Sequence, residues 1–470
     1  MAATGALGVS IPRRPPSDPC RASFSQERLW FLDQMEPGNP AYNVFRGVVL
    51  RGPLDVPALE RTLAEIVRRH EVLRTTFSVV DGLLVQQIHD AKISLPMRDL
   101  SQRDNAKEIA DREAERAFDL SADSLLRARL LRLAPEEHVL ILTMHHIAVD
   151  GFSVALLFRE LVTLYQAFSS GKESALSEPP VQFVDYAAWE RQWLNQERLS
   201  KLLDYWKTQL AEMPVALMLP ADRPRPAMQT SNGARYYFRI RRVQLEPLKS
   251  LGRQQNVTLF MTLLAAFQAL LARYSGQEEF GAGSPMACRE IEGVKELIGC
   301  FSNTLVLRAN LTGNPSFNEL LRRVRETVVG GISHQMMPFD KLVEALHPIR
   351  DPSRMALVQV NFRLLSTPLP AVAGDLKLEF LELDNRRSKF DLALELAENA
   401  GELSGYWEYS ADLLEPESIA CMASDYEDLL QAVAAAPDQP ISELGFRPRF
   451  GRQREGQPSH SGRKPVYLRP

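Results

Sequence analysis

The sequence predicts an α/β or α+β protein in which helices are layered on sheets. Short apolar or alternating runs, typical of strands, recur along the chain between longer stretches whose apolar residues are spaced by three and four. Some neighbouring strands are joined by hairpins and others by helical crossovers, a mixture that favours a layered sandwich. The two halves of the chain carry similar elements but share no sequence repeat, so any duplication lies in the fold.

Composition sets limits on the class of protein. The chain has 470 residues, of which 45% are hydrophobic and 24% are charged, as in ordinary globular proteins. This length is enough for two or three structural units with cores of their own. The formal net charge of -4 argues against nucleic acid as a partner, because such a partner requires a strongly basic surface. No apolar run approaches a membrane span, and the N-terminus lacks the apolar core of a signal peptide.

The cysteines indicate a reducing compartment. They lie far apart and show neither metal-binding nor disulfide spacing, at Cys20, Cys288, Cys300 and Cys421. Reduced thiols of this kind are typical of cytosolic proteins. We therefore expect a cytoplasmic monomer that binds no metal and has no membrane partner.

Apolar periodicity places the elements of the first half. Helices are expected at 25–35, 54–70, 106–118, 179–194 and 199–210. Strands are expected at 44–52, 125–133 and 139–142, with a hairpin over 75–90 that turns at Asp81-Gly82. The strand at 139–142 is expected to pair with its predecessor.

The second half repeats the mixture after a proline-rich linker at 216–234. Strands are expected at 234–243, 280–289, 304–311, 358–364 and 376–383, with a strand pair over 388–414. Helices are expected at 257–274, where Thr258 would be the N-cap, and at 316–330 and 416–434.

One stretch, from His138 to Tyr165, carries the candidate chemistry. It begins as a buried strand and ends as an amphipathic helix, for which Ser153 is the expected N-cap. Between strand and helix lie His145 and His146. A strand end followed by a helix start projects side chains from a rigid base.

Asp150 and Gly151 complete this junction. A histidine has a pKa near neutrality, so it can take a proton from a nucleophile or return one. The carboxylate four residues later would hold the imidazole, or anchor the loop through an arginine elsewhere. Gly151 would let substrate approach the backbone. A purely structural role is equally compatible with this stretch alone. The histidines would then only end the strand, and Asp150 would be a solvated turn residue.

Seven motifs in order give the chain a resemblance to the condensation domains of nonribosomal peptide synthetases. The resemblance covers about residues 20–448. The motifs are SFSQERLWFL (23–32), RHEVLRTTF (69–77), MHHIAVDGFS (144–153), FVDYAAW (183–189), IGCFSNTLVLR (298–308), HQMMPFDKLV (334–343) and RDPSRMALVQVNF (350–362). The third is similar to the hallmark HHxxxDG motif of that family.

The resemblance implies two chloramphenicol-acetyltransferase-like lobes in a V-shaped pseudo-dimer, with an active-site tunnel between them. On this basis we expect an N-terminal lobe at 21–190, carrying the HHxxxDG motif, and a C-terminal lobe at 191–448. Residues 1–20 would be a flexible lead-in. Residues 449–470 are basic, lack apolar periodicity and would form a disordered tail.

The resemblance also assigns roles to residues. His146 would be the catalytic histidine, His145 its structural neighbour, and Asp150 the anchor of the loop. Arg74, from the second motif, would support the site as the salt-bridge partner of Asp150. Gly151 would border the acceptor channel.

Three further residues are candidates for the tunnel wall: Phe152, Ser153 and Asn303. The family pattern often has tryptophan where this chain has Phe152. This and the other departures, in the sixth and seventh motifs, remove no catalytic group. Tyr186 and Trp189 are expected to pack rather than to react.

The implied activity is acyl transfer in peptide antibiotic or other secondary metabolite biosynthesis. Donor and acceptor carrier proteins would each deliver a substrate as a thioester on a phosphopantetheine arm, and the chain itself would bind no cofactor. An acceptor amine would give an amide, and an acceptor hydroxyl an ester. The chain starts at Met1 and carries no adenylation or carrier segment, so a free-standing enzyme is expected.

Four relatives with the same fold are alternatives. An epimerisation domain would carry a second acidic motif in the distal lobe, which is not found. A heterocyclisation domain would have aspartates in place of His145 and His146. A non-catalytic recruitment module usually has a broken hallmark motif, which is intact here. A coenzyme A-dependent acyltransferase would act without carrier proteins.

Overall fold

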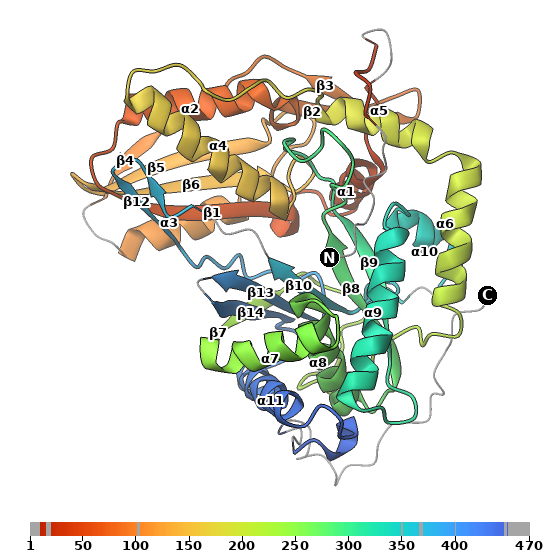
Figure 1. The fold of residues 1–470 in the computed structure, drawn as a ribbon. Coiled ribbons are helices and arrows are strands. Elements are labelled where there is room, and N and C mark those ends of the chain that lie inside the picture. Colours follow the sequence, from red (N-terminus) through yellow and green to blue (C-terminus); the bar gives the residue numbers. More distant parts are fainter. Residues whose placement is uncertain are drawn as a thin grey trace. The chain divides into compact units, whose positions relative to one another are not determined.

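The chain folds into two compact units (Figure 1). The computed structural model describes residues 10–15, 20–100, 104–348, 351–365, 370–399, 401–445 and 449. The expected lead-in at 1–20 and the expected tail at 449–470 lie mostly outside these residues. Unit 1 comprises residues 1–198, 287–302 and 369–385, and unit 2 comprises the rest. The chain therefore leaves unit 1 after Arg198 and returns to it twice.

Unit 1 is built on a six-stranded sheet with the strand order β11-β12-β1-β6-β5-β4. The strands are β1 (Asn43–Arg51), β4 (Met97–Asp99), β5 (Leu126–Ala134), β6 (Glu137–His145), β11 (Val372–Ala373) and β12 (Leu376–Phe380). β6 pairs antiparallel with β1 on one side and with β5 on the other, the second of these as the sequence predicts. β6 is therefore an interior strand, and its end is held on both sides.

Helices cover both faces of this sheet. α2 (Val56–Arg69) and α4 (Gly151–Ser169) lie on one face, and α3 (Asp104–Glu115) lies on the other (Figure 1). Apolar residues of α3 pack on alternate residues of the strands, among them Phe45, Val49, Val139 and Ile141. Unit 1 also contains α1 (Phe24–Met35), α5 (Phe183–Trp193), two short 3₁₀ helices, η1 (Pro40–Tyr42) and η2 (Glu71–Arg74), and the hairpin of β2 (Thr75–Val80) and β3 (Leu83–Ile88).

Unit 2 contains a second six-stranded sheet with the order β7-β14-β13-β10-β8-β9. The strands are β7 (Gly233–Ile240), β8 (Glu279–Met286), β9 (Asn303–Asn310), β10 (Val360–Leu365), β13 (Leu392–Asn399) and β14 (Glu402–Ser410). β10 runs parallel to both of its neighbours, whereas the other pairs are antiparallel. Such a mixed sheet needs helical crossovers as well as hairpins.

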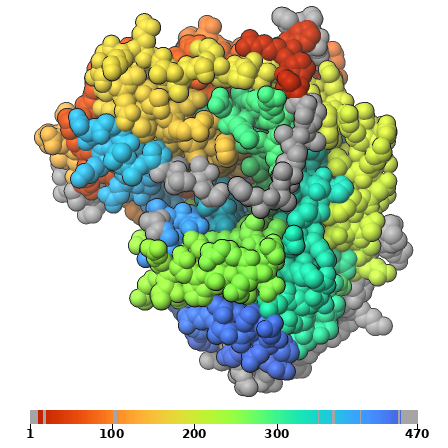
Figure 2. Space-filling view, viewed as in Figure 1, coloured from red at the N-terminus to blue at the C-terminus, as the bar shows by residue number. Residues whose placement is uncertain are grey.

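Four helices pack together against the sheet of unit 2. They are α7 (Arg242–Gln254), α8 (Leu259–Ser275), α9 (Phe317–Ser333) and α11 (Pro416–Ala435). α8 is the most buried of them, while α7 and α11 form part of the outer surface (Figure 2). The remaining helices of the described chain are α6 (Gln196–Gln209), α10 (Phe339–Leu346) and the 3₁₀ helix η3 (Ile441–Glu443).

The α+β class expected from the sequence is confirmed, and most predicted elements are present. Helix α7 was not predicted, because Pro247 and Gly252 within it are unfavourable in helix interiors and hide its periodicity. Leu245, Leu248 and Leu251 nevertheless line its buried side. No single helix in the described part of the chain is long and apolar enough to span a membrane, although α7 and α8 pass that test as a pair bent by 106°.

The N-cap of α8 provides a test of the fold of unit 2. Thr258 has an extended backbone, and its hydroxyl accepts a hydrogen bond from the N–H of Met261 at 3.3 Å, as the sequence predicts. Thr258→Ala removes this acceptor and should lower the free energy of unfolding by about 1 kcal/mol in urea denaturation. Thr258→Ser keeps a hydroxyl cap and should stay within a few tenths of a kcal/mol of the parent. Equal losses in both variants would contradict the capping role.

Candidate active site

The candidate site lies where β6 ends and α4 begins. His145 is the last residue of β6 and is paired with Asn43 of β1. Its side chain is buried, its Nδ1 accepts the N–H of Ile147 at 3.2 Å, and its ring meets the edge of Phe118. These contacts bury the ring among residues of unit 1, and the role of His145 beside the catalytic histidine stays a prediction.

His146 is the first residue beyond the strand. Its backbone N–H donates to the carbonyl of Tyr42 at 2.9 Å, which fixes the start of the turn. Its side chain is half-buried, and Nδ1 lies 3.5 Å from Sγ of Cys300. The half-buried ring on a fixed backbone is compatible with proton transfer to a bound molecule.

The N-cap of α4 is Asp150, not Ser153 as predicted. Asp150 has an extended backbone, and its Oδ1 accepts the N–H of Ser153 at 2.7 Å. The prediction was wrong because aspartate caps as well as serine does, and the helix begins three residues earlier, at Gly151. The carboxylate also lies at the positive end of the helix dipole, which favours its charge.

Asp150 forms a buried ion pair with Arg289. Oδ1 lies 3.0 Å from Nη2, and the two side chains are only 2% and 4% exposed. Arg289 also donates through Nη1 to the carbonyls of Val294 and Leu297 at 2.9 and 2.7 Å. A buried pair of this kind fixes geometry, and removal of one partner leaves an uncompensated charge.

The expected partner of Asp150 was Arg74, and this expectation needs correction. Arg74 ends the 3₁₀ helix η2, donates to the carbonyl of His89 and lies 3.8 Å from the carboxylate of Glu71. The arginine that pairs with Asp150 comes from the segment after β8, far along the chain. Its sequence signal, an arginine directly after a buried strand of small residues, is too weak to assign a partner.

The segment that follows Arg289 folds back onto the start of α4. The N–H of Gly299 donates to Oγ of Ser153 at 3.0 Å, and the N–H of Phe301 donates to Oδ2 of Asp150 at 3.1 Å. Oγ of Ser25 donates to the carbonyl of Cys300 at 2.7 Å. Both oxygens of Asp150 and the hydroxyl of Ser153 are therefore used to hold this segment in place.

Each of the three residues predicted to line the tunnel contacts other residues of its own unit. The guanidinium of Arg289 lies over the ring of Phe152 at 4.6 Å and over that of Phe301 at 4.3 Å, in cation–π contact. Ser153 is fully buried, so it does not line a channel. Asn303 donates to the carbonyls of residues 335 and 337 and accepts the N–H of residue 339, which fixes the turn before α10.

The remaining predicted residues lie as follows. Gly151 is half-buried at the first turn of α4, and its place beside an acceptor channel stays a prediction. Tyr186 and Trp189 are buried in α5, as expected of packing residues. In the part of the chain that the structure describes, no group of three or more His, Cys, Asp or Glu side chains is arranged to hold a metal ion.

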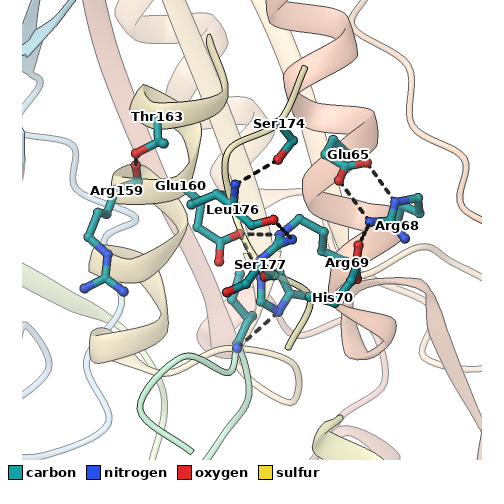
Figure 3. Close-up of polar contacts among 12 residues, drawn as sticks. Glu65, Arg68, Arg69, His70, Arg159, Glu160, Thr163, Ser174, Leu176 and Ser177 are labelled. Atoms are coloured by element: carbon teal, nitrogen blue, oxygen red, sulfur yellow. Dashed lines mark hydrogen bonds and ion pairs between the residues drawn. The ribbon is translucent and has the colours of Figure 1, made fainter. Parts of the chain in front are cut away.

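A buried charged cluster that the sequence did not reveal holds the other side of the Gly299 segment. Arg69 and His70, at the end of α2, converge on Glu160 of α4 at 3.4 and 2.9 Å (Figure 3). Burial alone would raise the pKa of Glu160, but the hydrogen bond from His70 and the neighbouring charges outweigh it and lower the pKa. His70 Nδ1 accepts the N–H of Ile298 at 3.5 Å, so this cluster also reaches the segment.

The role of Arg289 as the partner of Asp150 can be tested by comparing the stability of variants at Arg289 and Arg74. Arg289→Ala leaves Asp150 buried without its cation, so it should lower the free energy of unfolding by roughly 3–5 kcal/mol. Arg74→Ala removes an ion pair near the surface and should cost about 1 kcal/mol or less. Urea denaturation of the two variants measures both values. Equal losses would place Arg74 in the same structural role as Arg289.

Gly299 tests how closely the segment packs. A Cβ atom on Gly299 would lie 2.0 Å from Cδ2 of Phe183, a ring that is itself buried. Gly299→Ala should therefore cost roughly 1–3 kcal/mol of unfolding free energy through overpacking. Gly445→Ala is the control, because a Cβ there meets nothing within 4 Å. A Gly299→Ala variant as stable as this control would mean that the segment moves away freely.

Comparison with known proteins agrees with this geometry. The family model "Condensation domain" matches residues 17–454. A protein of the linear gramicidin synthase of Brevibacillus parabrevis is 44% identical over 432 residues, which are 90% of this chain and 6% of that protein. The chain therefore spans a small fraction of the length of this curated relative.

Several solved structures are also similar to this chain over most of its length. The X-domain from teicoplanin biosynthesis has a TM-score of 0.83 at 28% identity, over 93% of this chain and 99% of the X-domain. A complex of the X-domain with OxyB matches with a TM-score of 0.82. SgcC5 from Streptomyces globisporus has a TM-score of 0.74 at 26% identity, over 89% of this chain and all of SgcC5. The motifs, the fold and these similarities agree: the chain belongs to the condensation domain family.

Proposed function

We propose that this chain joins an acyl or aminoacyl thioester donor to an amine or hydroxyl acceptor. The observation that carries the proposal is the intact junction at the end of β6. His146 is half-buried there on a backbone held by Tyr42, and Asp150 secures the following turn through its ion pair with Arg289. Such a junction keeps an imidazole in one position from which it can exchange protons with substrate.

The reaction needs one proton to be moved twice. The acceptor nitrogen or oxygen attacks the thioester carbonyl, and a tetrahedral intermediate forms with a new C–N or C–O bond. His146 takes the proton that the nucleophile loses. The C–S bond then breaks, and the imidazolium returns the proton to the departing sulfur, so that the histidine ends as it began.

The benefit from His146 depends on the acceptor. A neutral amine is already a good nucleophile, so the histidine mainly positions it and carries the proton away. A hydroxyl attacks poorly until its proton is removed, and a positioned general base accelerates such a step by about 10²–10⁴-fold. The amine and hydroxyl acceptors therefore differ in how far the rate should fall without His146.

The substrates would arrive on partner proteins. We infer that a donor carrier protein presents a thioester on its phosphopantetheine arm and that an acceptor carrier protein presents the nucleophile on its own arm. The two groups would meet at His146. Gly151, the first residue of α4, is the residue that we expect to border the path of such an arm. The arms are substrates of the reaction, and no residue of this chain is proposed to hold one permanently.

Recruitment of another enzyme is the second candidate function. The similarity to the X-domain favours it, since that domain is found in complex with OxyB. The intact histidine pair and the buried anchor of Asp150 favour catalysis instead, because binding a partner at the surface does not require them. The two functions differ in whether transfer occurs at all.

The deciding experiment is a two-carrier transfer reaction followed by intact-protein mass spectrometry. Donor-loaded carrier is mixed with a carrier bearing an amine or a hydroxyl acceptor, and a parallel reaction supplies the donor as a coenzyme A thioester. Wild type should move the acyl group between carriers. His146→Ala should reduce the rate by about 10²–10⁴-fold with the hydroxyl acceptor.

His89→Ala is the control, because His89 is an exposed histidine of the same unit. It should transfer at the wild-type rate. Transfer from coenzyme A without any carrier would favour the acyltransferase alternative. Absence of transfer with every donor and acceptor, together with tight binding of a partner protein, would overturn the catalytic proposal.

A further inference from the structure

The thiol of Cys300 contacts the imidazole of His146. Sγ lies 3.5 Å from Nδ1, a normal distance for a hydrogen bond that involves sulfur. Cys300 is buried, with 2% of its surface exposed. A contact at Nδ1 decides which ring nitrogen carries the proton, because neutral imidazole has one donor and one acceptor nitrogen.

The backbone that carries the sulfur is held in place on both sides of Cys300. Gly299 is bonded to Ser153, and Phe301 is bonded to Asp150. The carbonyl of Cys300 itself accepts the hydroxyl of Ser25. The backbone of three successive residues is thus held to other elements of unit 1, so only rotation of the Cys300 side chain can move Sγ away from His146.

The thiol stays protonated at neutral pH. Burial, and then the negative charge of Asp150, raise the pKa of Cys300 to about 12. A neutral thiol is a weak donor and a weak acceptor. The hydroxyls of Ser25 and Ser302 also face the sulfur, so the S–H has partners besides the imidazole.

We propose that Cys300 is a positioning residue, whose sulfur accepts the N–H of Nδ1 and so holds His146 in the Nδ1-protonated tautomer. In this tautomer the lone pair lies on Nε2, on the other side of the ring, and a proton from the acceptor nucleophile would pass to that nitrogen. The catalytic consequence rests on the proposed function of His146. The contact itself does not, and it can be measured separately.

The first test reads the tautomer directly by nuclear magnetic resonance. The whole chain is labelled with ¹⁵N-histidine, and the His146 signals are assigned by their loss in His146→Ala. In wild type at neutral pH, Nδ1 should have the chemical shift of a protonated nitrogen and Nε2 that of an unprotonated one. The opposite assignment in wild type would overturn the proposal.

Three variants separate the acceptor from the volume of the side chain. Cys300→Val fills the same space without an acceptor, so the His146 signals should move toward the Nε2-protonated tautomer. Cys300→Ser restores an acceptor and should return them toward the wild-type positions. Cys288→Ala removes the other buried thiol of unit 1 and should leave them unchanged.

The second test is the rate of transfer at saturating acceptor. Cys300→Val should lower it about three- to tenfold, the effect of one neutral hydrogen bond, with KM unchanged. Cys300→Ser should restore most of the rate. Signals and rates that do not differ between wild type and Cys300→Val would refute the role of Cys300. If wild type transfers nothing while its signals still shift in Cys300→Val, the contact is supported and the proposed function fails.

Discussion

The candidate site depends on one buried carboxylate. Asp150 caps helix α4, pairs with Arg289 and accepts the N–H of Phe301, so a single side chain joins three parts of unit 1. A charge in such a place is stable only while every partner is present, because the cost of its desolvation is large. The junction at His146 is therefore built as a whole: helix start, ion pair and returning segment form together or not at all.

This construction explains why the imidazole can be partly exposed and still well positioned. Its backbone is held by the interior strand β6 and by Tyr42, and its Nδ1 meets a sulfur from the returning segment. Glu160 and His70 support the same segment from the far side. The polar groups of Asp150, Ser153 and Glu160 are thus occupied in holding the segment that lies against His146.

The sequence was most informative where chemistry is local. Alternating and helical periodicity located nearly all strands and helices, and the HHxxxDG spacing located the histidines, Asp150 and Gly151. The sequence did not reveal partners that are distant in the chain. Arg289, Gly299 and Cys300 are adjacent to Asp150 and His146 only after folding. Arg74 was chosen in place of Arg289 because a spacing along the chain does not show which buried arginine meets a given carboxylate. Ser153 and Asp150 were both sound N-caps by composition, and only the first hydrogen bond of the helix distinguishes them.

The strands that form the sheet of unit 1 are translated at very different times. β1 pairs with β6, which follows soon after it, but its other neighbour is β12, from the third segment of the unit. At about 5–20 residues per second, a ribosome reaches β12 tens of seconds after β1 has emerged. During that interval one edge of β1 has unpaired N–H and C=O groups, which invite pairing with another chain. A nascent chain of this protein therefore has a long period of vulnerability to aggregation, which ends only when β12 has been translated and has paired with the sheet.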